Sequence, residues 1–420
     1  MNSPATRGPQ PPVRFGGARW LNVALAAMGF LALVWLGYQT WRLLFQAAPK
    51  GAVDLLLRHG ECQEWFRGVA IYETRVDAVY PPASYLVLWP LLGWSSTGFV
   101  RVFWLAPTIL STAWLCALVA RHSGALDASR RRLLWVLPLA SYPIGASVGN
   151  GQLSILVVAC VGAGVMLVAD APRSWRRDLS IAALMLVALV KPSMSAYFFW
   201  IPLLIPGGFR AACLVVAGYA LLTVAACAAQ PHGPVDLIEQ WLSRAAAGVR
   251  YGASVGGGAM PLAKGSSITG INLHSVLIAL GQGAWIRMLS PAPLLLLGAW
   301  VFMRRRADVL ILLGVAAIVA RFASYHGWYD DVLLLMPLVA LIRCARVAEA
   351  PRARAVAAWL ALVGGLFLLA PGGTHLGRLG LPTLANVYVV SQAVFWVVAM
   401  VFLARAARSP VPLAHAVASA

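Results

Sequence analysis

Five of the 14 acidic residues lie within residues 54–77 of a chain that is 60% hydrophobic. The first of them, Asp54, follows a long apolar run. A carboxylate at a membrane edge can sit in a cavity that is partly desolvated but open to water. Partial burial of this kind raises the carboxyl pKa towards the working range of a general base. A loop aspartate that is solvated at the headgroup level is the alternative.

Two basic residues stand at the ends of apolar runs. Lys191 ends one run just before Pro192, and Arg321 ends another. An isolated intramembrane lysine is costly and implies an anionic partner, for which a lipid phosphate is suited, although snorkelling to the interface is the alternative. Positive residues on the translocated side of a membrane oppose the usual bias. Function therefore explains Lys191 and Arg321 better than topology does.

The segment after Arg321 combines aromatic rings with polar groups, namely His326, Trp328, Tyr329, Asp330 and Asp331. Aromatic faces beside hydrogen-bonding groups suit a sugar ring, but Trp and Tyr also anchor ordinary spans at the interface. A second polar segment, residues 251–272, is rich in glycine and fits no nucleotide-binding fingerprint. It is either a solvated loop or a lid over a substrate.

Neither a metal site nor nucleic-acid binding is predicted. The chain has six cysteines but no CxxC, HExxH or dense His/Cys cluster. Its net charge of +19 comes from arginines grouped at the ends of apolar runs, as in the topology signals of membrane proteins.

The elements that must position these residues are membrane helices. A mean hydropathy of +0.77 and recurrent long apolar runs predict an all-α polytopic protein. The arginine clusters place both termini in the cytoplasm and predict about twelve crossings. The predicted spans are residues 20–45, 98–120, 131–148, 150–170, 178–191, 193–206, 209–229, 288–303, 307–321, 329–346, 355–371 and 383–404.

This topology predicts one membrane domain, residues 20–404, between cytoplasmic tails at 1–19 and 405–420. Three loops then lie on the outer face: 46–96, 230–287 and 322–328. Within the first loop, residues 81–96 are apolar but short, which favours a juxtamembrane or re-entrant segment.

The order of several short motifs resembles glycosyltransferase family 87, a branch of the GT-C integral membrane glycosyltransferases. The resemblance extends from about residue 20 to about residue 340 and rests on the order of the motifs, since each is short. They are Asp54, Gly68-(x)3-Tyr72, Tyr80-Pro81-Pro82, Asn150-Gly151-Gln152, Lys191-Pro192 and Trp328-Tyr329-Asp330-Asp331.

The resemblance implies inverting transfer of a sugar, mannose or another hexose or pentose, from a polyprenyl monophosphate to a glycan or glycolipid. It implies a GT-C-like bundle with outer juxtamembrane helices in a bacterial inner membrane, active in cell-envelope synthesis on the periplasmic side. Asp54 matches the base and Lys191 the basic residue that meets the donor phosphate. Tyr80, Asn150 and Gln152 match polar positions that line the cavity.

Further candidates come from the charges and from a departure from the family pattern. Arg321 and Arg101 are further candidates to stabilise the departing phosphate. Some family members carry a His-His pair where this chain has Asp330-Asp331. His326, Trp328, Asp330 and Asp331 are therefore the candidates for sugar or acceptor contacts. A phosphate leaves without protonation, so the scheme requires no cofactor or divalent metal.

Two other classes fit the composition. A transporter or flippase for an anionic lipid-linked substrate would also be polytopic and basic, and internal repeats with paired broken helices would identify it. We find no such repeat, and the polar groups gather on one predicted face. A non-catalytic membrane scaffold is the second alternative, but it would give Asp54 and Lys191 no shared purpose.

Overall fold

The structure is a computed structural model, and it is all-helical in the part of the chain that it describes. No β-strand occurs among these residues, which confirms the predicted fold class for them. The described residues are 17–48, 50–124, 127–255, 271–282, 285–323 and 326–408. The glycines at 256–258 and the segment 266–270, considered above as loop or lid, lie outside them.

The first half of the described chain contains twelve α-helices and one 3-10 helix. They are α1 (Gly17–Phe45), α2 (Val53–Phe66), α3 (Ile71–Thr74), α4 (Pro82–Leu92), α5 (Thr97–Phe103), α6 (Leu105–His122), α7 (Ala128–Ala140), α8 (Tyr142–Asn150), α9 (Ser154–Asp170), α10 (Trp175–Ala188), α11 (Pro192–Ser195), η1 (Ala196–Phe198) and α12 (Trp200–Leu204).

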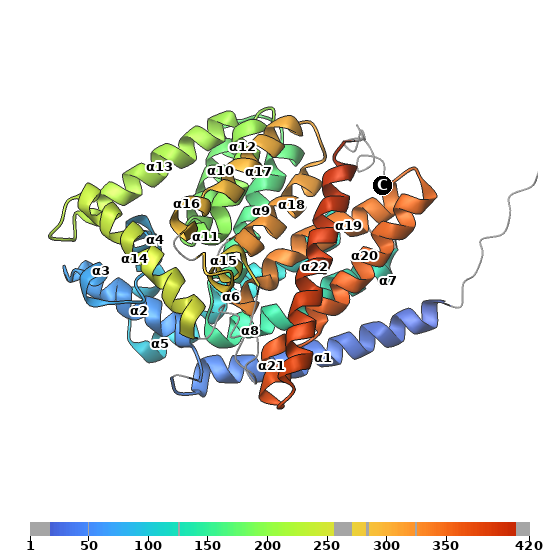
Figure 1. Cartoon of the computed structure of the whole chain (residues 1–420), viewed down its shortest axis with the longest axis horizontal. Coiled ribbons are helices and arrows are strands. Elements are labelled where there is room, and N and C mark those ends of the chain that lie inside the picture. Colours follow the sequence, from blue (N-terminus) through green and yellow to red (C-terminus); the bar gives the residue numbers. More distant parts are fainter. Residues whose placement is uncertain are drawn as a thin grey trace, which may run out of the picture.

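The second half continues the bundle (Figure 1). Its helices are α13 (Phe209–Cys227), α14 (Pro234–Val255), α15 (Leu273–Ala279), α16 (Ile286–Leu289), α17 (Ala292–Met303), α18 (Val309–Ala323), η3 (Trp328–Leu334), α19 (Leu335–Val347), α20 (Pro351–Leu369), α21 (Gly373–Arg378) and α22 (Pro382–Ala406).

Five helical segments among the described residues are long and apolar enough to cross a membrane. They are α1 from Trp20, the α5–α6 pair, α13, α20 and α22. Four shorter apolar helices, α4, α9, α17 and α18, have 10–17 residues. The membrane character of the chain is thus supported, whereas the count of about twelve crossings is not confirmed.

Two of the predicted spans are divided into shorter helices. The run 131–148 is interrupted at Ser141, whose ψ of 139° is extended, and α8 restarts with Pro143 in its first turn. The run 193–206 becomes the short helices α11, η1 and α12. Proline lacks a backbone donor and favours the first turn of a helix, so Pro143 is suited to the start of α8.

The centre of the bundle is α9, whose residues are buried on nearly every side. It packs against α6, α10 and α18, and η3 also contacts it. A helix that is apolar all round belongs in an interior of this kind. Figure 1 shows α9 inside the bundle, with α1 along the bottom of the view and the α13–α14 pair at the left.

Helix α2, the first helix of the predicted outer loop 46–96, is held against the turn that follows α8. The Ala52 N–H donates to the Gly149 carbonyl at 3.0 Å, and Ala52 has a left-handed φ of 54°. Gly151 has a φ of 66°, and a Cβ at this position would lie 2.4 Å from Cβ of Leu55. This close approach places Asp54, in the first turn of α2, beside residues 149–152.

We expect Gly151→Ala to destabilise the protein. An alanine there has a strained φ and overlaps Leu55, so the cost is about 2 kcal/mol. The measurement is the midpoint of thermal unfolding in detergent. The control is Gly365→Ala, where an added Cβ meets nothing within 4 Å. Equal unfolding midpoints for Gly151→Ala and wild type would show that the packing of α2 does not depend on the close approach of Gly151 to Leu55.

Candidate active site

Asp54 lies half-buried where α2 meets the turn after α8. Its carboxyl is hydrogen-bonded by the Gln152 side chain, and the positive charges of Arg58 and Lys191 act on it. Burial raises the pKa of Asp54 above its ordinary value, and these cations only partly oppose the effect. A carboxylate in this state accepts a proton more readily than a solvated aspartate does.

Lys191 is buried at the break between α10 and α11. The chain leaves the helical conformation at Lys191, which has φ −121° and ψ 76°, and Pro192 opens α11. Its Nζ lies 2.6 Å from Oδ1 of Asp330 and donates to the Ser154 hydroxyl at 3.3 Å. Ser154 also donates to Asp330. The cation therefore has the anionic partner that its burial requires, and that partner is a protein carboxylate.

Asp330 is supplied by η3 and is contacted from several elements. His326 Nδ1 lies 3.0 Å from its second oxygen, Oδ2. The ring of Tyr329 lies below Lys191, with Nζ 5.4 Å from the ring centroid. The Tyr329 carbonyl accepts a hydrogen bond from Ser147 at 3.0 Å. These contacts fix η3 against α8, α9 and the start of α11.

Tyr80 is close enough to interact with both Asp54 and Lys191. It is buried, and its hydroxyl interacts electrostatically with both residues. The guanidinium carbon of Arg58 lies 4.4 Å from the centroid of the Tyr80 ring. The Tyr80 carbonyl accepts a hydrogen bond from the Tyr72 hydroxyl at 2.6 Å.

Arg58 is in turn held by Glu61. Its Nη1 lies 2.5 Å from Glu61 Oε2, which also accepts from the Tyr85 hydroxyl at 3.3 Å. Burial raises the pKa of the Glu61 carboxyl to about 7. Asp54, Arg58, Tyr80, Lys191 and Asp330 thus form one buried charged cluster.

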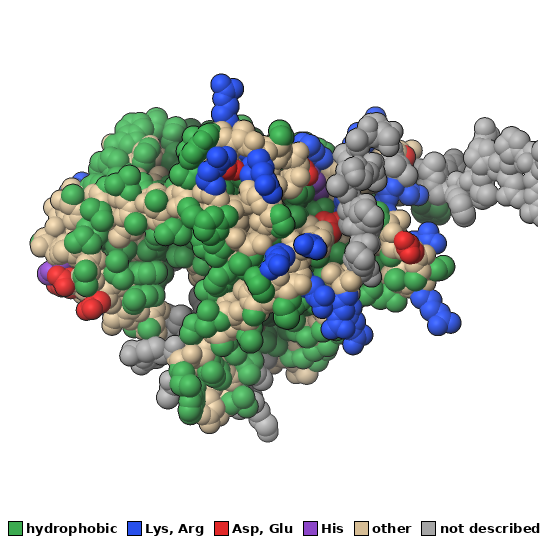
Figure 2. All heavy atoms as spheres, turned by 90° about the horizontal axis from the view of Figure 1, so that it is seen from above, with side chains coloured by type: hydrophobic (Ala, Val, Ile, Leu, Met, Phe, Trp, Pro, Cys, Tyr) green, Lys and Arg blue, Asp and Glu red, His purple; other side chains and the backbone are tan. Residues whose placement is uncertain are grey.

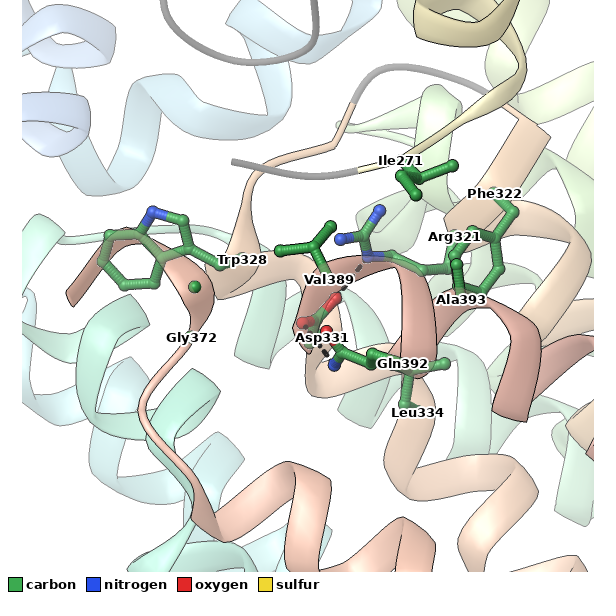
Figure 3. A pocket seen from close by; sticks show the side chains of 11 residues that line it. Ile271, Arg321, Phe322, Trp328, Asp331, Leu334, Gly372, Val389, Gln392 and Ala393 are labelled. Atoms are coloured by element: carbon green, nitrogen blue, oxygen red, sulfur yellow. Dashed lines mark hydrogen bonds and ion pairs between the residues drawn. The ribbon is translucent and has the colours of Figure 1, made fainter. Parts of the chain in front are cut away.

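A second buried ion pair lies on the other side of η3. Arg321 in α18 pairs with Asp331, and Gln392 in α22 donates to the other Asp331 oxygen at 3.4 Å. Figure 3 shows Asp331 between these two side chains, at a small cavity that Trp328 also lines. Nη1 of Arg321 is buried and has no hydrogen-bond partner among the described residues. It remains a donor for a ligand or a water at the cavity.

An aromatic row extends from the same segment. The ring centroid of Trp328 lies 5.2 Å from that of Tyr142, which lies 5.2 Å from that of Trp35 in α1. The Tyr142 hydroxyl lies 2.6 Å from Nε2 of His375. Rings at this spacing offer an apolar face with polar edges, which suits a sugar.

Two of the sequence-predicted residues have other surroundings. Arg101 donates to the carbonyls of Leu43, Leu44 and Gln46, at distances of 2.8–3.4 Å. It therefore caps the end of α1, where orphan carbonyls attract a guanidinium. Asn150 is half-buried as the last residue of α8, two residues before Gln152.

Residues 78–324, more than half of the chain, match glycosyltransferase family 87. The chain belongs to glycosyltransferase family 87. No curated protein and no solved structure matched it.

Membership of family 87 confirms the resemblance drawn from the sequence motifs and indicates a glycosyltransferase. The matched region contains Tyr80, Asn150, Gln152, Lys191 and Arg321. Asp54 and Asp330 lie outside it, on either side. Their proximity to the matched residues comes from the fold.

Several residues of the site were not singled out from the sequence, among them Arg58, Ser154 and Gln392. Arg58 had a signal, because it lies four residues after Asp54 and therefore one helical turn away. Ser154 and Gln392 lie inside apolar runs, where a single small or neutral polar residue has many explanations. Among the described residues, no group of three or more His, Cys, Asp or Glu side chains is placed to hold a metal ion.

We expect substitutions at Lys191 and Asp330 to have non-additive effects on the stability of the protein. Lys191→Met or Asp330→Asn alone leaves a buried charge or a lone polar group, and each should cost about 3 kcal/mol. The double variant removes both charges and should cost less than the two single changes together. Unfolding midpoints of the four proteins in detergent measure this. Costs that simply add would mean that the two side chains are not an ion pair.

Proposed function

We propose that this family 87 protein transfers a sugar from a polyprenyl monophosphate to a glycan or glycolipid acceptor with inversion at the anomeric carbon. The observation that supports it most is the position of Asp54. A carboxylate with a raised pKa lies beside two buried cations, Lys191 and Arg58. A base next to cations is the arrangement needed to activate a hydroxyl and release a phosphate.

The reaction follows from these charges. Asp54 takes the proton of the acceptor hydroxyl while that oxygen forms a bond to the anomeric carbon. The bond from this carbon to the phosphate oxygen breaks, and the electron pair stays on the departing polyprenyl phosphate. Because the phosphate leaves as an anion, it needs no general acid, in contrast to the leaving group of a glycosidase.

Lys191 is the proposed phosphate ligand. An ammonium group has three N–H donors, and Asp330 and Ser154 account for two of them. The third is available to a phosphate oxygen. Asp330 already accepts from Lys191, Ser154 and His326, so we propose that it orients Lys191, although it was predicted as a sugar contact. Arg58 supplies a second positive charge nearby.

The sugar and the acceptor are proposed to lie between Asp54 and the polar groups around it. Tyr80 and Gln152 are the nearest candidates for hydroxyl contacts, and Asn150 lies on the same turn as Gln152. Trp328 and the aromatic row behind it offer a stacking surface. Arg321 keeps one buried N–H donor for a phosphate or a hydroxyl.

An apolar groove next to the charged cluster supports a lipid-linked donor. Two of its lining residues, Pro81 and Pro192, directly follow Tyr80 and Lys191 in the sequence. Val216 and Val224 of α13 line it and are each 58% exposed. The groove is lined by Pro81, Pro82, Leu189, Pro192, Ala196, Phe199, Trp200, Val215, Val216, Tyr219, Ala220, Thr223, Val224, Pro234, Ile238, Trp241 and Leu294.

The composition of this groove fits a prenyl chain. Nearly all of its lining side chains are hydrocarbon or aromatic, and α13 is a candidate membrane span. A prenyl chain could therefore enter sideways from the bilayer while its phosphate reaches Lys191. We propose that the reaction takes place on the outer face of a bacterial inner membrane, because the arginine clusters favour that orientation.

We expect Asp54→Asn to lower sugar transfer by about a thousandfold, the usual contribution of a general base. The protein should remain folded, since an amide keeps the shape of the side chain. Transfer from a polyprenyl-phosphate sugar by purified protein measures this. The control is Glu64→Gln on the same helix, whose partly exposed side chain pairs with Arg75. If the Asn variant keeps wild-type activity, Asp54 is not the base.

A second prediction concerns the apolar groove. Ala220→Trp fills it and should raise KM for a long-chain polyprenyl donor at least tenfold, while a donor analogue with a short prenyl chain is affected less. The control is Leu221→Trp, because Leu221 is adjacent, 70% exposed and outside the groove lining. Equal KM values for the two variants would remove the groove from donor binding.

A further inference from the structure

A recess rich in arginine lies at the end of the bundle where α17, α18 and α22 meet. It is open to solvent and has a volume of about 480 Å³. Figure 2 looks onto the molecule from above this end and shows basic side chains among hydrophobic ones. The arginine recess is lined by Phe302, Met303, Arg304, Arg305, Arg306, Ala307, Ala407 and Arg408.

The recess is separate from the charged cluster around Asp54. Helix α18 begins at Val309, just after the recess. Its last turn carries Arg321, which pairs with Asp331, the residue next to Asp330 of the cluster. At 1.5 Å per residue, the two ends of this helix are about 20 Å apart. The segments that form the recess are about a hundred residues apart in the sequence, so the fold brings their charges together.

Four arginines line the recess, and none of its described lining residues is acidic. Among the described residues, none of the four takes part in an ion pair. Nε of Arg304 is buried without a hydrogen-bond partner in this part of the chain. By contrast, the nearby Arg343 pairs with Asp308 at 3.2 Å. Unpaired cations held together repel one another and favour an added anion.

Apolar side chains also line the recess, and they favour a lipid as the source of that anion. Phe302 and Met303 are 54% and 66% exposed at the end of α17. On the same helix, Leu295 and Leu296 are 60% and 70% exposed. Large apolar side chains with this exposure face lipid in a membrane protein, and α22 is a candidate span. The recess therefore combines cationic side chains with exposed apolar ones, which is the combination that an anionic lipid requires.

We propose that the arginine recess binds the phosphate headgroup of an anionic phospholipid. The headgroup phosphate pairs with the arginines, and the acyl chains lie along Phe302 and Met303. The lipid belongs to the leaflet on this side of the membrane, which the arginine bias assigns to the cytoplasm. The orientation of the protein in the membrane explains basic residues on the cytoplasmic side, but it does not explain why they gather in one recess.

Native mass spectrometry of the detergent-purified protein tests this proposal. The probes are phosphatidylglycerol, which is anionic, and phosphatidylcholine, which is zwitterionic, at equal concentrations. We expect the wild type to retain more phosphatidylglycerol. Each arginine removed should lower this preference about fivefold, since a basic residue near an anionic surface contributes about 1 kcal/mol.

The test variants are Arg305→Ala/Arg306→Ala and, independently, Arg408→Ala, all at exposed positions. The matched control is Arg131→Ala/Arg132→Ala, which removes two exposed arginines from α7. The proposal is overturned if the wild type shows no preference, or if the control loses as much preference as the recess variants. It is also overturned if equimolar inorganic phosphate displaces the lipid, since the site would then take a free anion.

Discussion

The structure around the site depends on the buried pair of Lys191 and Asp330. A buried lysine is tolerated only with a partner, and here the partner comes from η3, far along the chain. Ser154 on α9 bonds to both members of the pair. One ion pair thus ties together α9, the α10–α11 break and η3. Asp54 is brought to the same place by the close approach of α2 to the turn at Gly151.

In this arrangement Asp54 lies beside the two buried cations Arg58 and Lys191. Asp54 keeps a raised pKa, because burial outweighs the attraction of Arg58 and Lys191. The two cations are held by their own carboxylates, Asp330 and Glu61, and so remain in place without a substrate. Beside them the apolar groove opens towards α13. A ligand with a hydrocarbon chain next to a phosphate matches both surfaces at once.

The sequence predicted part of this site. Asp54 and Lys191 could be proposed from the sequence because each follows or ends an apolar run, where a charged side chain is costly. Arg58 lies one helical turn after Asp54 in the sequence, but its position over the Tyr80 ring depends on how the chain folds around α2. Arg101 was predicted to stabilise the departing phosphate, and in the structure it donates to carbonyls at the end of α1. The span count went unconfirmed where apolar runs are divided into short helices, as at Ser141 before Pro143 and within residues 193–206.

The most direct measurement is the pH dependence of kcat/KM for purified wild-type protein with a panel of polyprenyl-phosphate sugars, and with the matching nucleotide sugars for comparison. We predict turnover of a lipid-linked donor alone. Because Asp54 must be deprotonated to act, kcat/KM should rise with pH through one ionisation above the ordinary aspartate range. Turnover of a nucleotide sugar, or a rate that does not change across this range, would contradict a lipid-linked donor and a buried aspartate base.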